Sequence, residues 1–223
     1  MDINELKAEK LFDLQASVLG EKLCEYRYPW EILPHLKEIL PALGEELETC
    51  GYRQIAPQVW AGEDVSIAAT ASIQGPCIIG AGTEIRHCAY IRGDVLIGKK
   101  CVVGNSTELK NSVLFDCVQV PHYNYVGDAV LGKGAHLGAG SVISNLKSDK
   151  KNIVISHNGE TLETGLRKFG ALVGDGTEVG CGCVLNPGTI VGRECRIYPL
   201  SSVRGVVPEK HIYKQADQIV PIL

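Results

Sequence analysis

The stretch Ile79–Ile97, read as I-G-A-G-T-E-I-R-H-C-A-Y-I-R-G-D-V-L-I, decides the fold because an isoleucine returns at every sixth position. Apolar residues keep this period on both sides of the stretch, and after one slip of four residues they resume it. The members outside the stretch are Ile67, Ile73, Val103, Leu109 and Phe115, then Leu131, Leu137 and Ile143, and finally Val173, Val179, Leu185, Val191, Ile197 and Val203. A short, fixed period of this kind predicts a solenoid.

Small residues follow the same period. The position four residues after an apolar member is almost always Ala, Ser, Thr or Cys, and the position immediately after the member is often Gly. Each hexapeptide therefore predicts one flat strand and one corner, where glycine relieves backbone strain, and the aliphatic side chain points into a triangular prism. Three hexapeptides close one coil, and a coil buries its interior by stacking on its neighbours. The predicted fold class is all-β, a left-handed parallel β-helix of hexapeptide repeats.

The period divides the chain into segments. We expect the β-helix over residues 57–205, with an excursion at 146–172 whose Asn158-Gly159 pair predicts a hairpin turn, and a closing strand or tail at 206–223. Residues 1–56 lack the period and carry helical spacing, with prolines breaking the second part into short turns. We predict that these helices form an N-terminal cap over the unpaired strand edges of the first coil. Binding of a partner is the alternative.

Composition limits the classes of function. The 223 residues include 25 Gly but only 3 Phe and 2 Trp, which suits a prism too narrow for large rings. A net charge of −4, without a basic run interleaved with aromatic residues, argues against nucleic acid as a partner. A charged N-terminal stretch and the lack of a long apolar run predict no membrane association and a cytoplasmic protein.

Nine cysteines raise the question of metal or disulfides. Four of them, Cys77, Cys101, Cys183 and Cys195, occupy the small position of the repeat, so they are expected to be packing residues. The pair Cys181 and Cys183 is too close for the usual paired zinc ligands. We predict no metal site.

Charged residues stand at positions that the repeat does not require. Arg92 and Lys110 are eighteen residues apart, which is one full coil, so the two cations should stack about 5 Å apart. Like charges this close are unfavourable unless an anion lies beside them. The spacing therefore predicts a phosphate site.

A histidine lies at the slip in the repeat. His122 follows Pro121 there, and we expect the four extra residues to bulge from the prism. A histidine on such a bulge, a few coils from a cation pair and from Glu108, is a candidate general base.

These residues carry a resemblance to a known family. Pro121-His122, the run from Tyr125 to Ala129, the run from Leu137 to Ser141, and Asn145 resemble the acetyltransferase domain of the bifunctional N-acetylglucosamine-1-phosphate uridyltransferase/glucosamine-1-phosphate acetyltransferase. The resemblance covers roughly residues 60–205. It implies a left-handed β-helical homotrimer that uses acetyl-CoA and acetylates the amine of an amino-sugar phosphate.

The resemblance also implies roles for single residues. His122 matches the general base and Glu108 a glutamate near it, Arg92 and Lys110 match cations that hold the sugar phosphate, and Tyr125 and Asn145 match further substrate contacts. His136 stands where the family has a sugar-contacting asparagine, and Cys181 where it has a serine near the acyl donor. With Lys168, Cys181 is expected to lie at the donor site.

Other functions stay open at this point. The Gly-rich signature of the uridyltransferase half is missing and residues 1–56 are too short for that domain, so we expect no nucleotide-sugar synthesis. One alternative is a non-catalytic module that binds a sugar phosphate or assists a separate sugar nucleotidyltransferase. Another is a β-helical zinc carbonic anhydrase using His87, His122 and His136, although no histidine lies five residues after His122.

Overall fold

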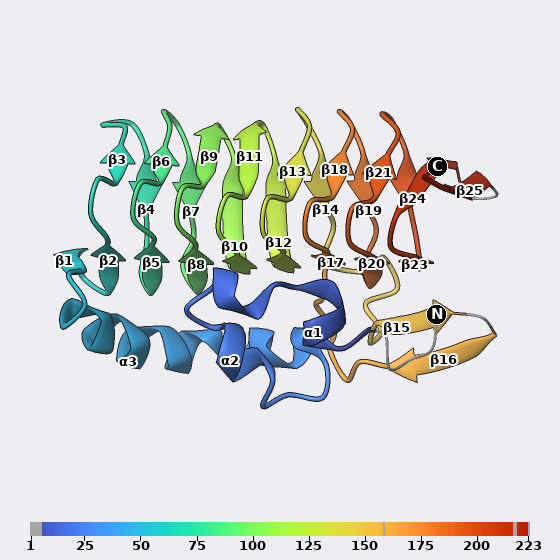
Figure 1. The fold of residues 1–223 in the computed structure, drawn as a ribbon, viewed down its shortest axis with the longest axis horizontal. Helices are drawn as coiled ribbons and strands as arrows, with labels where there is room; N and C mark the ends of the chain where they lie inside the picture. Colours follow the sequence, from blue (N-terminus) through green and yellow to red (C-terminus); the bar gives the residue numbers. More distant parts are fainter. Residues whose placement is uncertain (1–5, 158, 216–217, 223) are drawn as a thin grey trace.

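The computed structural model describes residues 6–157, 159–215 and 218–222, and its main body is a parallel β-helix with three walls (Figure 1). The predicted fold class is confirmed, and the β-helix is the left-handed, hexapeptide-repeat kind. We call the walls A, B and C in the order in which the chain builds them. Each successive coil adds one strand to every wall, so neighbouring strands of a wall are parallel.

The strands of each wall follow one another along the prism. Wall A holds β2 (Val59–Ala61), β5 (Cys77–Ile79), β8 (Val95–Ile97), the second halves of β10 (Glu108–Leu114) and β12 (Tyr125–Leu131), β17 (Ala171–Val173), β20 (Thr189–Val191) and β23 (Val206–Val207). Wall B holds β3 (Ser66–Ile67), β6 (Glu84–Ile85), β9 (Val102–Asn105), β11 (Gln119–His122), β13 (His136–Leu137), β18 (Glu178–Val179), β21 (Arg196–Ile197) and β24 (His211–Gln215). Wall C holds β4 (Ser72–Ile73), β7 (Tyr90–Ile91), the first halves of β10 and β12, β14 (Val142–Ile143), β19 (Val184–Leu185) and β22 (Ser202–Val203).

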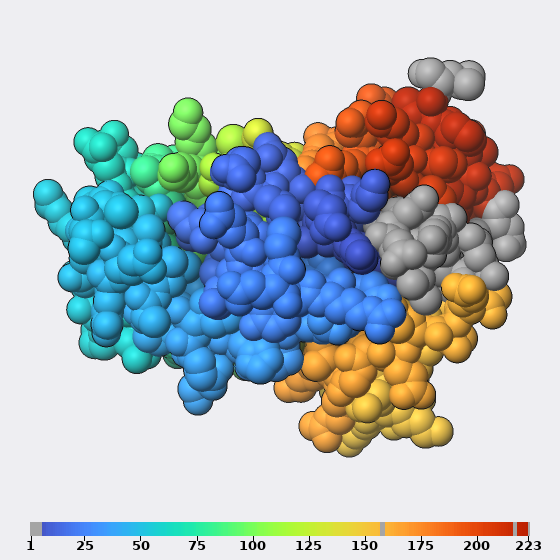
Figure 2. Space-filling model, turned by 60° about the horizontal axis from the view of Figure 1, so that its bottom comes forward, coloured from blue at the N-terminus to red at the C-terminus, as the bar shows by residue number. Residues whose placement is uncertain are grey.

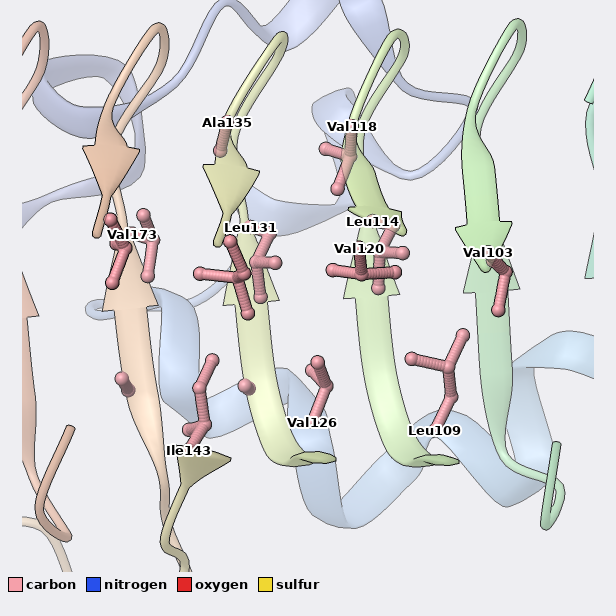
Figure 3. Close-up of a cluster of buried hydrophobic side chains, with 14 of the residues drawn as sticks. Val103, Leu109, Leu114, Val118, Val120, Val126, Leu131, Ala135, Ile143 and Val173 are labelled. Atoms are coloured by element: carbon pink, nitrogen blue, oxygen red, sulfur yellow. The ribbon is translucent and has the colours of Figure 1, made fainter. Parts of the chain in front are cut away.

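The core fills the prism with aliphatic side chains from all three walls (Figure 3). Val120 from wall B, Val126 from wall C and Leu131 from wall A are all fully buried there. Stacking of such layers removes apolar surface from water, and this burial is the main stabilising contribution in a repeat fold.

The repeat changes length beside His122, but not as we predicted. Glu108 pairs with Tyr90, eighteen residues earlier, whereas Ser112 pairs with Val95, only seventeen earlier. The coil from β10 to β12 is also seventeen residues long. One residue is therefore removed at each of two successive corners, and the predicted four-residue bulge is wrong.

Tight corners explain the shorter coils. Asn111 and Asp128 turn these corners with φ values of 47° and 49°, so β10 and β12 run from wall C into wall A as unbroken seven-residue strands. The inward residue after Leu109 is consequently Leu114. Phe115, which we expected inside the prism, lies outside it and stacks on Phe12 with 5.1 Å between ring centroids.

The N-terminal segment lies along wall A, not over the first coil as predicted (Figures 1 and 2). It consists of α1 (Ala8–Leu11), η2 (Leu14–Ala16), α2 (Gly20–Leu23), η3 (Pro29–His35) and α3 (Leu36–Glu48). The segment packs on wall A because the middle residue of each wall A strand is apolar and points outward, so the helices bury these side chains. This outward stripe comprises Trp60, Ile78, Leu96, Val113, Val130, Leu172, Ile190 and Val206. The edge of the first wall A strand is paired by β1 (Arg53–Ala56).

The excursion contains the expected antiparallel hairpin, formed by β15 (Val154–His157) and β16 (Glu160–Glu163). Asn158 of the predicted turn lies outside the described residues. Ile153 and Ile155 are buried in the same cluster as the outward stripe of wall A. The excursion therefore leaves the prism at the corner between walls C and A and packs back onto wall A.

The last residues, predicted as a closing strand or tail, form strands that continue the β-helix. β24 extends wall B, and Tyr213 from it is 2% exposed in the core. β25 (Gln218–Pro221) then pairs with β24 in the antiparallel sense. Within the described part of the chain, no helix has the length and apolar character needed to cross a membrane.

Candidate active site

A buried carboxylate organises the corner between walls C and A. Asp128 is 3% exposed and accepts hydrogen bonds from Lys110 Nζ at 3.2 and 3.3 Å, from Asn111 Nδ2 at 2.7 Å and from Asn145 Nδ2. Lys110, Asp128 and Asn145 stand at this corner in successive coils, so the shortened repeat brings them together. Sequence reasoning assigned no role to Asp128, although it lies inside the stretch that carries the resemblance.

Tyr125 joins this group from wall C. Its hydroxyl accepts a hydrogen bond of 3.3 Å from Asn145 Nδ2. A Cβ at Gly127 would lie 2.6 Å from the Tyr125 hydroxyl and 2.9 Å from Asn145 Nδ2, so glycine is required there for the two side chains to meet. Burial, and then the charges of Asp128 and Glu108, raise the pKa of Tyr125 above its ordinary value.

The two predicted cations do stack on neighbouring coils. The backbone N–H of Arg92 donates to Leu109 O, which places Arg92 beside Lys110. Arg92 Nη1 lies 2.7 Å from Glu108 Oε1, and this hydrogen bond raises the pKa of Arg92. Arg92 and Lys110 are thus each paired with a carboxylate. These pairs offset the repulsion between the two cations, so the stacking by itself does not require a bound anion. Their role in holding a phosphate remains a prediction.

His122 lies at an ordinary corner between walls B and C. It pairs with Asn105 of the preceding coil, its side chain is exposed, and its backbone N–H donates to Asn124 Oδ1 at 3.1 Å. Asn124 is buried and its Nδ2 donates to Gly138 O at 2.8 Å, which ties this corner to the next coil. β12 begins at Tyr125, three residues later, so His122 and the Asp128 cluster lie at opposite edges of wall C on one coil.

Glu108 stands on wall C between these two edges. It is the register partner of both Tyr90 and Tyr125. Among the described residues, the Glu108 side chain is hydrogen-bonded to Arg92 and not to His122. Its place near the histidine and the amine of a substrate stays a prediction.

The remaining predicted residues are distributed over three places. His136 points outward from wall B, where its Nδ1 lies 2.7 Å from Glu178 Oε2, and so the structure does not bring it to the wall C cluster. Cys181 is exposed at the corner between walls B and C, two coils beyond His122. Lys168 forms an antiparallel bridge with Leu146, beside Asn145 at the other edge.

In the part of the chain that the structure describes, no group of three or more His, Cys, Asp or Glu residues could hold a metal ion. Asn105 lies between His87 and His122 on their corner, and His136 is on wall B. The nine cysteines are all free thiols.

Comparisons with known proteins agree with the sequence resemblance. The family model of the GMPPB C-terminal domain matches residues 73–165. A bifunctional sugar-1-phosphate nucleotidylyltransferase/acetyltransferase from Sulfurisphaera tokodaii is 36% identical over 207 residues, covering 87% of this chain and 51% of that protein. The bifunctional protein GlmU of Methanococcus vannielii is 31% identical over 197 residues, covering 86% and 47%.

The chain thus spans about half the length of the curated relatives it matches. Among solved structures, the acetyltransferase domain of PglB from Neisseria gonorrhoeae in complex with acetyl coenzyme A matches 74% of this chain and 57% of that one. The identity is 14% and the TM-score 0.30, a likeness too weak to bear on the site.

Proposed function

The chain is similar, along most of its length, to the acetyltransferase region of the bifunctional sugar-1-phosphate nucleotidylyltransferase/acetyltransferases, and from this premise we propose that it is an N-acetyltransferase. It transfers an acetyl or other acyl group from acetyl-CoA to the amine of an amino-sugar phosphate or sugar nucleotide. The observation that carries the proposal is the Asp128 cluster with Lys110, Tyr125 and Asn145, of which Asp128 and Tyr125 share their coil with His122.

His122 is the proposed general base. An amine attacks a thioester only when it is neutral, and the imidazole of a histidine accepts a proton near neutral pH. The exposed side chain of His122 is open to a substrate lying on wall C. As the C–N bond forms, the proton passes from the amine to the imidazole, and the thiolate leaves. The reaction proceeds without a covalent enzyme intermediate.

The acceptor is proposed to lie against wall C. Lys110 and Arg92 supply positive charge for the phosphate, with Tyr125 and Asn145 donating or accepting hydrogen bonds at the sugar. Glu108 contacts the amine and limits its movement before attack. Because Arg92 and Lys110 already pair with carboxylates, a phosphate must share these cations with Glu108 and Asp128.

The donor is proposed to pass near Cys181 and Lys168. These two residues stand at opposite edges of wall C, so one chain alone does not bring them together. In a homotrimer the wall of one subunit faces a corner of the next. Cys181 and Lys168 of different subunits can then lie near one donor, and the corner that carries His122 in the neighbouring subunit can approach Glu108. In the described part of the chain the N-terminal helices pack on wall A, and we propose that walls B and C make such contacts.

Acyl transfer is tested by thiol release from acetyl-CoA with glucosamine 1-phosphate and a panel of amino-sugar nucleotides. We expect acceptor-dependent release that falls at least about 100-fold in His122→Ala, the scale of losing a general base. His87→Ala, an exposed histidine at the same corner two coils earlier, is the matched control and should keep full activity.

No release with any acceptor, together with sugar-phosphate binding that needs Lys110, would reject the enzyme. That result would favour the second candidate, a non-catalytic sugar-phosphate-binding module. The pairing of both cations with carboxylates, which holds their side chains in place without a substrate, is the observation that keeps this candidate open.

A further inference from the structure

A pocket of about 340 Å³ opens beside the Asp128 cluster, between the start of the excursion and the last coils. It is lined by Ser144, Leu146, Lys147, Ser148, Asp149, Asn186, Pro187 and Arg204. None of the residues in the proposed acceptor or donor sites lines it. It is therefore a separate feature of the same wall.

The pocket continues the column of residues that contains the two stacked cations. Ser144, Asn186 and Arg204 are in register on successive coils of wall C, since Val142 pairs with Val184 and Val184 with Ser202. Lys110 occupies the same column, with Gly127 and the overlying Tyr125 and Asn145 side chains in between. Four strand spacings separate Lys110 from Arg204, which is about 19 Å.

Arg204 differs from the earlier cations of the column because it forms no ion pair with a described residue, although Asp149 lines the same pocket. Arg92 is paired with Glu108 and Lys110 with Asp128. Among the described residues, no carboxylate lies within ion-pair distance of Arg204, whose side chain is exposed and lines the pocket. Its guanidinium is thus the cation of this column that is free to receive an external anion.

The surrounding segment is positively charged in a chain of net charge −4. Residues 146–169 contain five cations, Lys147, Lys150, Lys151, Arg167 and Lys168, against three acids, Asp149, Glu160 and Glu163. Lys147 Nζ lies 3.3 Å from Asp149 Oδ2, and this pair leaves the excess of two positive charges unchanged. The local excess favours an anionic ligand at the mouth of the pocket.

The polar groups of the lining fit a phosphate. A guanidinium binds phosphate oxygens through two parallel N–H bonds, and serine hydroxyls such as those of Ser144 and Ser148 can donate to the remaining oxygens. Asn186 is held in place, since its Nδ2 donates to Ser202 Oγ at 3.0 Å and to Val203 O at 2.8 Å. The floor of the pocket is therefore fixed before a ligand arrives.

We propose that this pocket binds a phosphate or diphosphate group of a nucleotide substrate, through Arg204 and the hydroxyls of Ser144 and Ser148. The inference rests on the proposed function for the identity of the ligand, which is either the nucleotide end of the acyl donor or the nucleoside diphosphate of a sugar-nucleotide acceptor. In both cases the reacting group extends along wall C toward the Asp128 cluster and His122.

The test is calorimetric titration of the full chain with coenzyme A, with UDP and with glucosamine 1-phosphate. Arg204→Gln should weaken the binding of coenzyme A, of UDP or of both by about tenfold or more, as expected for loss of a charge-assisted pair. Lys147→Gln should weaken the same ligand by a smaller factor. Arg196→Gln is the matched control, an exposed arginine on wall B of the same coil, and should bind within twofold of the wild type.

The outcomes separate the two sources and the two proposals. A loss confined to coenzyme A assigns the pocket to the donor, and a loss confined to UDP assigns it to the acceptor. Unchanged binding in Arg204→Gln, an equal loss in Arg196→Gln, or no nucleotide binding by the wild type would overturn the pocket. Nucleotide binding that needs Arg204, without any acyl transfer, would support the proposed phosphate pocket and reject the acyltransferase. Acyl transfer by the wild type, with nucleotide binding unchanged in Arg204→Gln, would support the acyltransferase and reject the pocket.

Discussion

Asp128 is the residue on which the candidate site depends most directly. Its carboxylate is nearly excluded from water and accepts hydrogen bonds from one ammonium group and two amide groups. Asp128→Asn replaces one carboxylate oxygen by an NH₂ group, which cannot accept these hydrogen bonds. We expect a loss of about 2–4 kcal/mol in the free energy of unfolding, measured with urea, and a KM for the acceptor raised about tenfold or more. The KM effect identifies a positioning residue, because a purely structural loss would lower the amount of active enzyme and leave KM unchanged.

Glu84→Gln is the control for this experiment. It removes a carboxylate from an exposed pair, in which Glu84 Oε2 lies 2.9 Å from Arg86 Nη2, and should change the free energy of unfolding by less than about 1 kcal/mol. Equal effects of the two variants would show that burial does not matter at Asp128.

The cysteines give a second prediction for single residues. Burial raises the pKa of Cys77 and of Cys101 to about 12 and that of Cys195 to about 11, and it also raises the pKa of Cys183. A raised pKa leaves less reactive thiolate at pH 8. We therefore expect five of the nine thiols to react with a thiol reagent in the native protein and the other four only on unfolding. The reactive five are Cys24, Cys50, Cys88, Cys117 and Cys181. Fast labelling of all nine under native conditions would contradict the packing of the prism.

Sequence reasoning named several members of the Asp128 cluster without predicting how they meet. Tyr125 and Asn145 were assigned through the resemblance, and the structure shows that Asn145 is level with Asp128 and reaches the Tyr125 hydroxyl from there. The partner of Lys110 was missed, since the stacking argument considered only the cations and treated Asp128 as part of a motif. His136 was assigned by position in a motif, and its outward direction on wall B follows only from the register of the coils.

The N-terminal segment is the element that the sequence described least well. Its helical spacing was clear, but its partner surface was not, because a search for every sixth residue finds the inward column and overlooks the outward stripe of wall A. Phe115 shows the same limitation: it fits the six-residue count from Leu109, yet a shortened corner turns Leu114 inward and leaves Phe115 to pack on Phe12.

Trp30 gives the prediction for this element. It is 1% exposed and lies between Tyr28, at 4.5 Å, and Phe169, at 5.6 Å between ring centroids. Trp30→Ala should lower the free energy of unfolding by about 3–5 kcal/mol, the range for deleting a buried aromatic ring. Urea denaturation measures the change. Val18→Ala, at a position 42% exposed in the same segment, should stay within about 0.5 kcal/mol of the wild type, and equal values for both would mean that the segment is not docked on wall A.

For the whole molecule we predict a trimer. Sedimentation equilibrium should give a mass of about three times the 24.1 kDa of the chain at micromolar concentration, because in the proposed function the edges of wall C that carry Cys181 and Lys168 belong to different subunits of one site. A mass of 24.1 kDa for an active enzyme would show that one chain is sufficient and would remove this argument.

The two shortened coils have a consequence for anyone who wishes to transplant this site into another scaffold. A host β-helix with uniform eighteen-residue coils would accept the side chains of β10 but would present them one residue out of step with those of β12. The transferable cassette is therefore the consecutive pair of seventeen-residue coils, together with the corner residues Asn111 and Asp128 that make them short. Grafting single residues into such a host would leave the side chains of β10 and β12 out of register with each other.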